Sequence, residues 1–256
     1  MPTQRTSGGD PARTLALLWR TGDKAPRRGP RPRRSIDDVV EAAIAFADDA
    51  GLDALTVRAL AARLTLSPMA VYTYVPGKAE LLDLMLDTLY LRMARPAWRP
   101  EQGWRERLAA VAAANRALLA DHPWAARVST ARPPLGPGLM AKYEHELAAL
   151  DDAGLDDVDR DAALTFLLGF VQASVVATQD VAGAGDDEAW WEAAGPLLAQ
   201  AMDAERYPLA VRVGAAAGAA QGAAFDPERA YAFGLERVLD GLAALIEPGP
   251  APPRRR

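Results

Sequence analysis

The sequence contains no cysteine and only two histidines among its 256 residues. Without cysteine the chain can form no disulfide bond and offers no thiolate as a nucleophile or metal ligand, which agrees with a reducing compartment. Two histidines are too few for an ordinary zinc site, and the sequence has no glycine-rich phosphate loop and no histidine–carboxylate spacing. The sequence therefore predicts no metal, no cofactor and no enzymatic activity.

A long apolar run is also missing. The N-terminus lacks the basic and then apolar pattern of a signal peptide, and the most apolar window, residues 162–178, is interrupted by Thr165, Gln172 and Ser174. That window is shorter than a membrane span. Because half of the residues are hydrophobic, the chain can bury a sizeable core. We expect a soluble, cytoplasmic protein that does not enter a membrane.

Lysine is scarce, and charge is divided unevenly along the chain. The net charge is −5, yet residues 1–34 hold nine Lys or Arg and two Asp, which gives them +7. These residues are rich in Pro, Gly, Arg and Ser and have no apolar periodicity, so we expect a disordered basic arm over 1–34. The arm either binds DNA, with Arg33 and Arg34 nearest the next helix, or is a solvated leader. The tail, residues 248–256, is also expected to be disordered.

Four helices are expected between residues 35 and 95. Ser35 can cap a helix whose apolar residues recur at steps of three and four until Gly51. Thr56 can cap a second, shorter helix, and Ser67 a third that has Pro68 at its first position. Gly77 precedes a fourth helix. Since three residues separate the second and third helices, the pattern predicts a three-helix unit that contains a helix-turn-helix.

The segment LSPMAVYTYVPGKAELL, residues 66–82, has no charged residue between Ser67 and Gly77. Val71 is expected to face the core, which leaves Pro68, Met69, Tyr72 and Thr73 toward a DNA groove. Small and aromatic groups there can contact thymine methyls, and hydroxyls can bond phosphates or base edges. The alternative is that the two tyrosines belong to the core or to a protein-binding patch.

The run LTVRALAARLTLSPMAVYTYVPGKAELLDLML closely resembles the DNA-binding segment of the TetR family of bacterial transcriptional repressors. The resemblance covers residues 35–86 and is most specific at Tyr72-x-Tyr74-Val75-x-x-Lys78. It implies DNA contacts from Arg58, Pro68, Met69, Ala70, Tyr72, Thr73, Tyr74 and Lys78, with Lys78 pairing with a phosphate. Thr56 and Ser67, the hydroxyl residues that cap the two helices, are also expected to contact DNA. One departure is Thr65, where the family usually has glycine. A β-branched residue resists positive φ, so we expect a turn that is slightly different or mildly strained.

Residues 96–247 are expected to form a larger, all-helical region for effector binding and dimerisation. Helices are predicted before His122, over residues 139–153, near 157–181 and over 226–247, whereas residues 214–224 have no interpretable pattern. Asp156, Asp157 and Asp159 are interpreted as a helix N-terminus, because no matching ligand spacing for a metal follows. The helix near 157–181 is apolar nearly all round and must be covered on two sides.

The resemblance implies that helices near 157–181 and 226–247 form a two-fold bundle between two copies of the chain. A homodimer is also what a helix-turn-helix needs to read a palindromic operator in double-stranded DNA. The alternative is that both helices belong to a monomeric core.

TetR relatives commonly enclose a small-molecule cavity in this larger region. We expect its walls to include Asn115, His122, Trp124, Met140, Tyr143, Phe166, Phe170 and Trp191, which would suit a partly apolar or aromatic effector. Each residue has a plainer explanation: core packing for an aromatic, and a satisfied internal hydrogen bond for Asn115.

The sequence as a whole predicts an all-α, homodimeric transcriptional regulator, most simply a repressor that a small molecule releases from its operator. The rivals are a constitutive DNA-binding protein with a filled cavity and an enzyme that uses the helical cavity.

Overall fold

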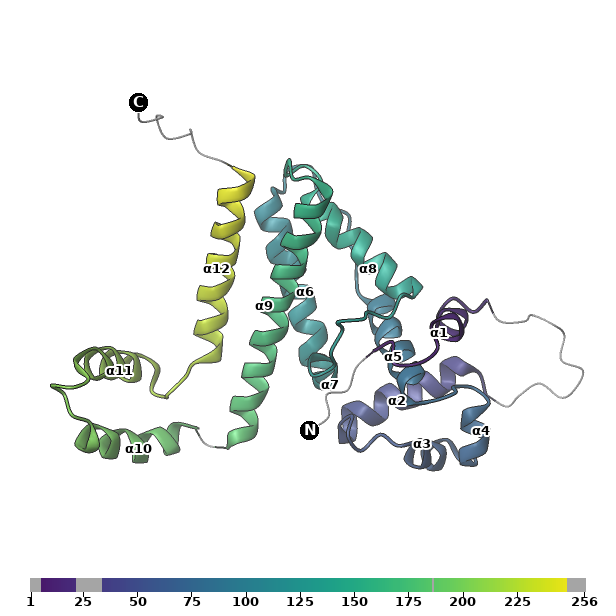
Figure 1. The fold of residues 1–256 in the computed structure, drawn as a ribbon, viewed down its shortest axis with the longest axis horizontal. Coiled ribbons are helices and arrows are strands. Elements are labelled where there is room, and N and C mark those ends of the chain that lie inside the picture. Colours follow the sequence, from purple (N-terminus) through teal and green to yellow (C-terminus); the bar gives the residue numbers. More distant parts are fainter. Residues whose placement is uncertain (1–5, 22–33, 186, 248–256) are drawn as a thin grey trace, which may run out of the picture.

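The computed structural model describes residues 6–21, 34–185 and 187–247, and the regular elements in these ranges are all helices (Figure 1). They are α1 (Pro11–Leu18), α2 (Ile36–Ala50), α3 (Val57–Leu64), α4 (Pro68–Tyr72), α5 (Lys78–Arg92), α6 (Trp104–Asp121), α7 (Pro123–Ala126), α8 (Pro137–Leu147), α9 (Asp157–Ala184), α10 (Asp187–Ala201), α11 (Pro208–Gln221) and α12 (Pro227–Ile246), with a 3₁₀ turn, η1 (Ala148–Leu150), after α8. The expected all-α fold is confirmed.

Helices α2 to α5 form the predicted helix-turn-helix unit, which we call the head. Its helices begin where the sequence places caps: the side chain of Ser35 accepts from the backbone N–H of Asp38, Thr56 from Ala59, and Ser67 from Ala70. Each such cap satisfies a backbone donor that the helix itself leaves without a partner. Gly51 ends α2 with φ at +81°, a conformation that favours glycine.

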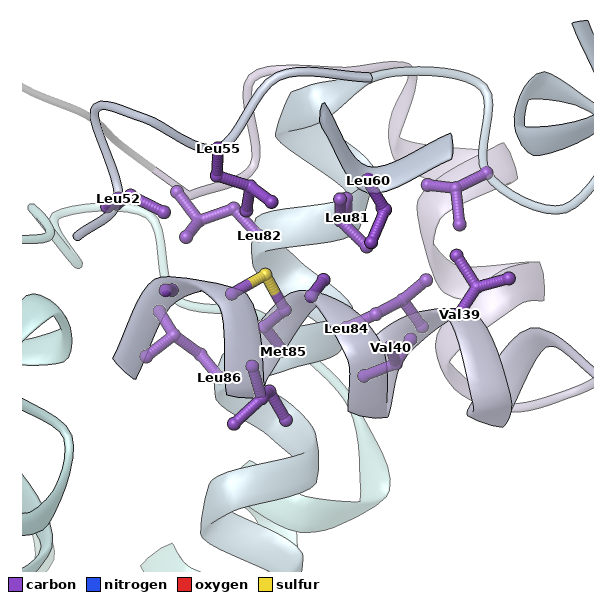
Figure 2. Close-up of a cluster of buried hydrophobic side chains, with 14 of the residues drawn as sticks. Val39, Val40, Leu52, Leu55, Leu60, Leu81, Leu82, Leu84, Met85 and Leu86 are labelled. Carbon is purple, nitrogen blue, oxygen red and sulfur yellow. The ribbon is translucent and has the colours of Figure 1, made fainter. Parts of the chain in front are cut away.

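The core of the head is built around α5 (Figure 2). Leucines and a methionine of α5 meet valines of α2 and leucines of α3 and the α2–α3 linker, and the residues of this cluster include Val39, Val40, Leu52, Leu55, Leu60, Leu81, Leu82, Leu84, Met85 and Leu86. Burial of a side chain of this size contributes about 1.5–3 kcal/mol. This packing fixes the position of α3 and α4 relative to α5.

A helix in the N-terminal arm was not expected. Asp10 caps α1 by accepting from the backbone N–H of Arg13 at 2.8 Å, and Thr14 and Leu18 are buried where α1 packs on α5 (Figure 1). The prediction of disorder over residues 1–34 is therefore wrong for residues 6–21. The predicted arm residues 22–33, Arg33 among them, and the tail 248–256 lie outside the described residues.

The larger region is a bundle in which α6, α9 and α12 pack together. Its core includes Leu108, Leu150, Leu164, Leu167 and Leu239. Asp156 caps α9 as predicted, by accepting from the backbone N–H of Asp159 at 2.9 Å.

Helix α8 joins the larger region to the head. Asp87 of α5 accepts from the backbone N–H groups of Gly138 at 3.1 Å and Leu139 at 2.8 Å, and so caps the start of α8. A Cβ on Gly138 would lie 1.9 Å from the carbonyl oxygen of Asp87, so the close approach of α8 to α5 requires glycine at this position.

Helix α9 is longer than predicted. By length and composition alone, Asp157–Gly183 could cross a membrane, because an 18-residue window within it has a mean hydropathy of 1.5, so the expectation that this apolar run is too short is wrong. In this structure α9 packs against α6 and α12. Part of the uninterpreted segment 214–224 belongs to α11, which lies with α10 apart from the main bundle (Figure 1).

Candidate DNA-reading surface and effector cavity

The turn between α3 and α4 contains a residue in the left-handed region. Thr65 has φ +57° and ψ +42°, so the chain keeps the turn that glycine would favour although the residue is β-branched. We expected either a slightly different turn or a mildly strained one, and the structure has the strained turn. An L-residue in this conformation costs about 1–2 kcal/mol.

Helix α4 presents the uncharged stretch to solvent. Met69 is 74 % exposed and Tyr72 is 44 % exposed, whereas Val71 behind them is 2 % exposed and packs in the head core. Pro68 and Thr73 are also exposed. The structure therefore places an apolar and aromatic surface on the solvent side of the helix-turn-helix, as the periodicity predicts.

Tyr74 differs from Tyr72, because it is half-buried and packs against the head core. Ala70 is half-buried too. The hydroxyl of Thr73 donates to the carbonyl of Ala70 at 2.6 Å, which leaves its lone pairs as acceptors. For Tyr74 the core alternative describes the ring best, whereas Tyr72 is free to contact a ligand.

The basic residues of the head divide into paired and unpaired groups. Arg63 pairs with Asp49 at 2.7 Å, and Arg92 pairs with Glu41. Arg58, near the start of α3, is exposed and makes no ion pair with any described residue. Lys78 opens α5 and donates one N–H to the carbonyl of Leu52 at 3.1 Å, which leaves two donors.

The capping groups lie at the same surface. The hydroxyls of Thr56 and Ser67 are exposed at the N-termini of α3 and α4 while they cap these helices. Arg34 is half-buried next to the start of α2. A helix N-terminus with free N–H groups and nearby hydroxyls suits a phosphate oxygen.

A cavity of about 560 Å³ lies between α8, α9 and the α7–α8 loop. Its lining is mostly apolar and consists of Thr130, Ala131, Pro133, Leu135, Leu139, Met140, Tyr143, Asp161, Leu164, Thr165, Leu168, Gly169 and Gln172. Met140 and Tyr143 are two of the predicted cavity residues. The hydroxyl of Tyr143 donates to Asp161 at 2.7 Å, and this hydrogen bond raises the pKa of Tyr143.

A second cavity, of about 540 Å³, lies between α6, α9 and α12. Its charged groups are paired with one another: Arg116 forms an ion pair with Glu228, and its guanidinium lies 4.1 Å from the ring centre of Tyr231. None of the eight predicted cavity residues is among its lining residues.

Two of the predicted cavity residues instead connect the larger region to the head. The indole N–H of Trp124 donates to Asp48 at 2.8 Å, and the Nδ1 of His122 lies 2.9 Å from the same carboxylate oxygen. Trp124 is 5 % exposed within the head core. The prediction that these side chains line an effector cavity is wrong, because α2 covers them.

Asn115 is buried in an internal polar cluster. Its amide donates to the carbonyl of Val111 at 2.9 Å and to the carboxylate of Glu146 at 2.6 Å, and Glu146 also pairs with Lys142 at 2.6 Å. The sequence left two interpretations of Asn115, a ligand contact and a satisfied internal hydrogen bond, and the structure shows the internal hydrogen bond. The assignment to ligand binding is therefore corrected.

The remaining three aromatics lie in three different places. Phe166 is 59 % exposed, Phe170 stacks on Tyr231 of α12 with ring centres 5.7 Å apart, and Trp191 packs against Gly218 of α11. The prediction that all eight residues share one cavity is wrong. Helical periodicity identifies side chains that turn away from solvent, but it does not say which interhelical contact each one enters.

Two family models cover most of the chain. Residues 39–85 match the model described as "Bacterial regulatory proteins, tetR family", and residues 96–246 match "Tetracyclin repressor-like, C-terminal domain". The chain belongs to the tetR family. It is therefore a DNA-binding transcriptional regulator, and members of the tetR family bind operator DNA as homodimers.

Three tetR-family relatives are especially informative. The HTH-type transcriptional repressor DrrR1 of Streptomyces coeruleorubidus is 40 % identical over 95 % of this chain and 90 % of its own length. The structure of ActR of Streptomyces coelicolor in complex with actinorhodin superposes with a TM-score of 0.72 at 27 % identity, over 84 % of this chain and 99 % of ActR. BioQ of Mycobacterium smegmatis with its double-stranded DNA operator superposes with a TM-score of 0.56 at 26 % identity, over 83 % and 99 %.

Proposed function

We propose that this protein is a repressor that reads a palindromic operator with α4 and leaves the operator when a small molecule enters the α8–α9 cavity. The observation that carries the proposal is the exposed surface of Met69 and Tyr72 above the buried Val71, on the second helix of a helix-turn-helix. In this role Tyr72 and Thr73 contact base edges, while Arg58 and Lys78 bind phosphates. The relative BioQ, which was solved with its operator, supports this assignment.

The dimer is proposed to form through α9 and α12. These helices pack against each other, and both keep large apolar side chains exposed: Phe166 on α9 is 59 % exposed, and Phe233 and Leu245 on α12 are 65 % and 50 % exposed. A second copy would cover these side chains and would explain why α9 is apolar nearly all round. The apolar length of α9 then serves a protein interface, which agrees with a cytoplasmic protein and not with a membrane span.

The α8–α9 cavity is proposed as the effector site because its walls connect to the head. The start of α8, which Asp87 of α5 caps, borders the cavity through Leu139, so a ligand that shifts α8 also shifts α5. Its volume of about 560 Å³ lies within the range of small-molecule sites, about 300–1,000 Å³. Among the described residues that line it, the cavity has no histidine, lysine or arginine, and its mostly apolar lining suits the binding of a small molecule.

The effector is proposed to be a multi-ring, mostly apolar compound with a few hydroxyl or carbonyl groups. Apolar walls would hold the rings, while Thr130, Tyr143 and Gln172 offer polar contacts. ActR was solved with actinorhodin, and other relatives carry the name tetracycline repressor protein, which supports ligands of this kind.

The DNA-binding part of the proposal is tested by selecting an operator from random-sequence DNA with the full-length protein and then footprinting the selected site. We expect a palindrome that binds two protomers, with half-site centres about 34 Å apart. A selected site without two-fold symmetry that binds one protomer would contradict the proposal.

The cavity is tested separately with multi-ring compounds screened by thermal shift. A compound that binds should lose affinity in the Tyr143→Phe variant, which cannot donate to Asp161, while operator binding without the compound stays unchanged. Tyr207→Phe, at the exposed α10–α11 junction, is the matched control. Unchanged affinity in Tyr143→Phe and Met140→Ala would place the ligand elsewhere.

A further inference from the structure

Residues 6–21, which we call the strap, lie across the junction between the larger region and the head (Figure 1). The proposed function gives the strap no role, because neither the DNA-reading surface nor the cavity lining includes it. Its contacts nevertheless reach the head and the loop that borders the cavity. They run from the α7–α8 loop on one side to α5 and α2 on the other.

On the first side, the strap ties down the loop that forms one wall of the effector cavity. The hydroxyl of Thr6, a residue only 1 % exposed, shares its one proton between the carbonyls of Ser129 and Arg132, and the backbone N–H of Thr6 donates to the carbonyl of Ser129 at 3.2 Å. The hydroxyl of Ser7 donates to the carbonyl of Pro133 at 3.1 Å, and the indole N–H of Trp19 donates to that of Leu135 at 2.8 Å. Side chains of this same loop, including Pro133 and Leu135, line the α8–α9 cavity.

On the second side, the strap is fixed to the head. The backbone N–H of Ser7 donates to Asp83 of α5 at 2.8 Å, and Arg20 forms an ion pair with Asp37 of α2. Leu18 is 3 % exposed and belongs to the head core. Gly9 lies so close to α5 that a Cβ would come within 2.1 Å of a carboxylate oxygen of Glu80.

The backbone of the strap is strained at both ends. Ser7 has φ +51° and Arg20 has φ +53°, and neither residue is glycine. Such conformations are strained and persist only where surrounding contacts hold them. Ser7 contacts both the loop and α5, and Arg20 contacts α2, so both strained residues are among those that make the contacts at the junction.

We propose that the strap is a mechanical link, additional to α5 and α8, through which the cavity wall controls the position of the head. A ligand that displaces the loop at residues 129–135 pulls on Thr6, Ser7 and Trp19, and the strap passes this displacement to α5 and α2. Thr6 and Trp19 are thus positioning residues for the response to effector. This inference rests on the proposed function of the α8–α9 cavity.

The test uses the absence of cysteine in the chain to fill the cavity at a chosen point. Met140, which lies on the cavity wall and is 37 % exposed, is replaced by cysteine. The new thiol is then alkylated with N-(1-pyrenyl)maleimide, because a thiol adds across the double bond of a maleimide. The measured quantity is the operator dissociation constant after labelling divided by that before labelling. In the protein with an intact strap we expect a ratio of about 10, within the usual 5 to 150 fold of allosteric coupling.

The strap is then loosened by Thr6→Val together with Trp19→Phe, which remove two of the side-chain donors to the loop and leave the Ser7 hydroxyl and the Thr6 backbone N–H in place. Valine keeps the size of threonine, and phenylalanine keeps an aromatic ring at position 19. We expect the labelling ratio to fall at least about threefold, because coupling between two sites weakens when their shared element is released. A merely structural role would change labelled and unlabelled affinities equally and leave the ratio unchanged. Trp19→Phe alone, at a side chain 47 % exposed, gives a milder version that keeps the fold.

The control matched to Trp19→Phe is Trp104→Phe. It removes the hydrogen bond of 2.9 Å from the indole N–H of Trp104 to Glu247, at a site that contains no strap or loop residue. Its labelling ratio should equal that of the parent. An unchanged ratio in the Thr6→Val and Trp19→Phe variant overturns the strap inference and leaves the proposed function standing. If labelling has no effect even with the strap intact, the cavity assignment fails and the strap inference fails with it.

Discussion

Replacement of Tyr72 by alanine should separate reading of the DNA sequence from attraction to its backbone. Tyr72 is 44 % exposed on the solvent side of α4, and Val71, which is 2 % exposed, holds the helix in place. The substitution should therefore leave the fold of the head intact. A good base contact is worth about 1–3 kcal/mol, and a homodimer makes it at both half-sites, so the expected loss is about 2–6 kcal/mol.

That loss corresponds to at least about a 30-fold increase in the dissociation constant for the operator. Binding to random DNA depends on phosphate contacts and should change by less than about twofold. Lys78→Ala, in contrast, should weaken binding to both DNAs. The assay is competition between the selected operator and a random duplex of equal length at one fixed salt concentration.

Two further variants sharpen the result. Tyr72→Phe keeps the ring, so it distinguishes an apolar contact from a hydrogen bond made by the hydroxyl. Tyr207→Ala makes the same chemical change at a residue 46 % exposed that lies between α10 and α11, and it should affect neither DNA. Equal losses on operator and random DNA for Tyr72→Ala would refute base reading by this residue.

Three other tests, one of which replaces four arginines together, address separate parts of the chain. Thr65→Gly should raise the free energy of unfolding by about 0.5–1 kcal/mol in chemical denaturation, because relief of the left-handed strain exceeds the added entropy of the unfolded chain; Thr65→Ala, which keeps a Cβ, should gain less. Replacement of Arg27, Arg28, Arg31 and Arg33 by serine should flatten the slope of log K against log salt by about 0.9 for each phosphate that the variant no longer binds, and an unchanged slope would show that this segment does not touch DNA.

The third test, Asp83→Asn, concerns pH. Burial, opposed by the Ser7 N–H and reinforced by Glu80 and Asp87, raises the pKa of Asp83 to about 6, so the native state holds this proton more tightly than the unfolded chain does. The contribution of Asp83 to stability is therefore fully present below its ordinary pKa of 3.8 and is lost as pH rises from there through about 6. The free energy of unfolding of Asp83→Asn minus that of wild type should therefore rise by about 2 kcal/mol between pH 4 and pH 8. A difference that stays the same at every pH would contradict this assignment.

The head could be predicted from the sequence because local signals and tertiary packing agree there. Ser35, Thr56 and Ser67 stand where helices begin, and the apolar spacing turns Val71 inward. Thr65 shows the limit of such reasoning. A β-branched residue prefers negative φ, which argued against the left-handed turn. The packing of α3 on α4 overrides this preference, because it is worth only about 1–2 kcal/mol.

The strap and the cavity could not be predicted in the same way. Helix α1 has eight residues, too few to be stable alone, and it forms because Leu18 and Thr14 pack against α5. The Asp10–Pro11 pair was the one local signal for its start. For Trp124, the sequence indicated burial but could not tell a contact with Asp48 of α2 from a cavity wall, because that choice depends on contacts between segments far apart in the chain.

Effector and operator are expected to weaken each other's binding to this protein. A compound found by the thermal-shift screen is titrated into the protein alone and into the protein saturated with its selected operator, and its dissociation constant is measured in both. We predict that operator weakens the compound by about 5 to 150 fold and that the compound weakens the operator by the same factor, as linkage requires. Equal affinity for the compound in both titrations would contradict the claim and would leave a constitutive DNA-binding regulator.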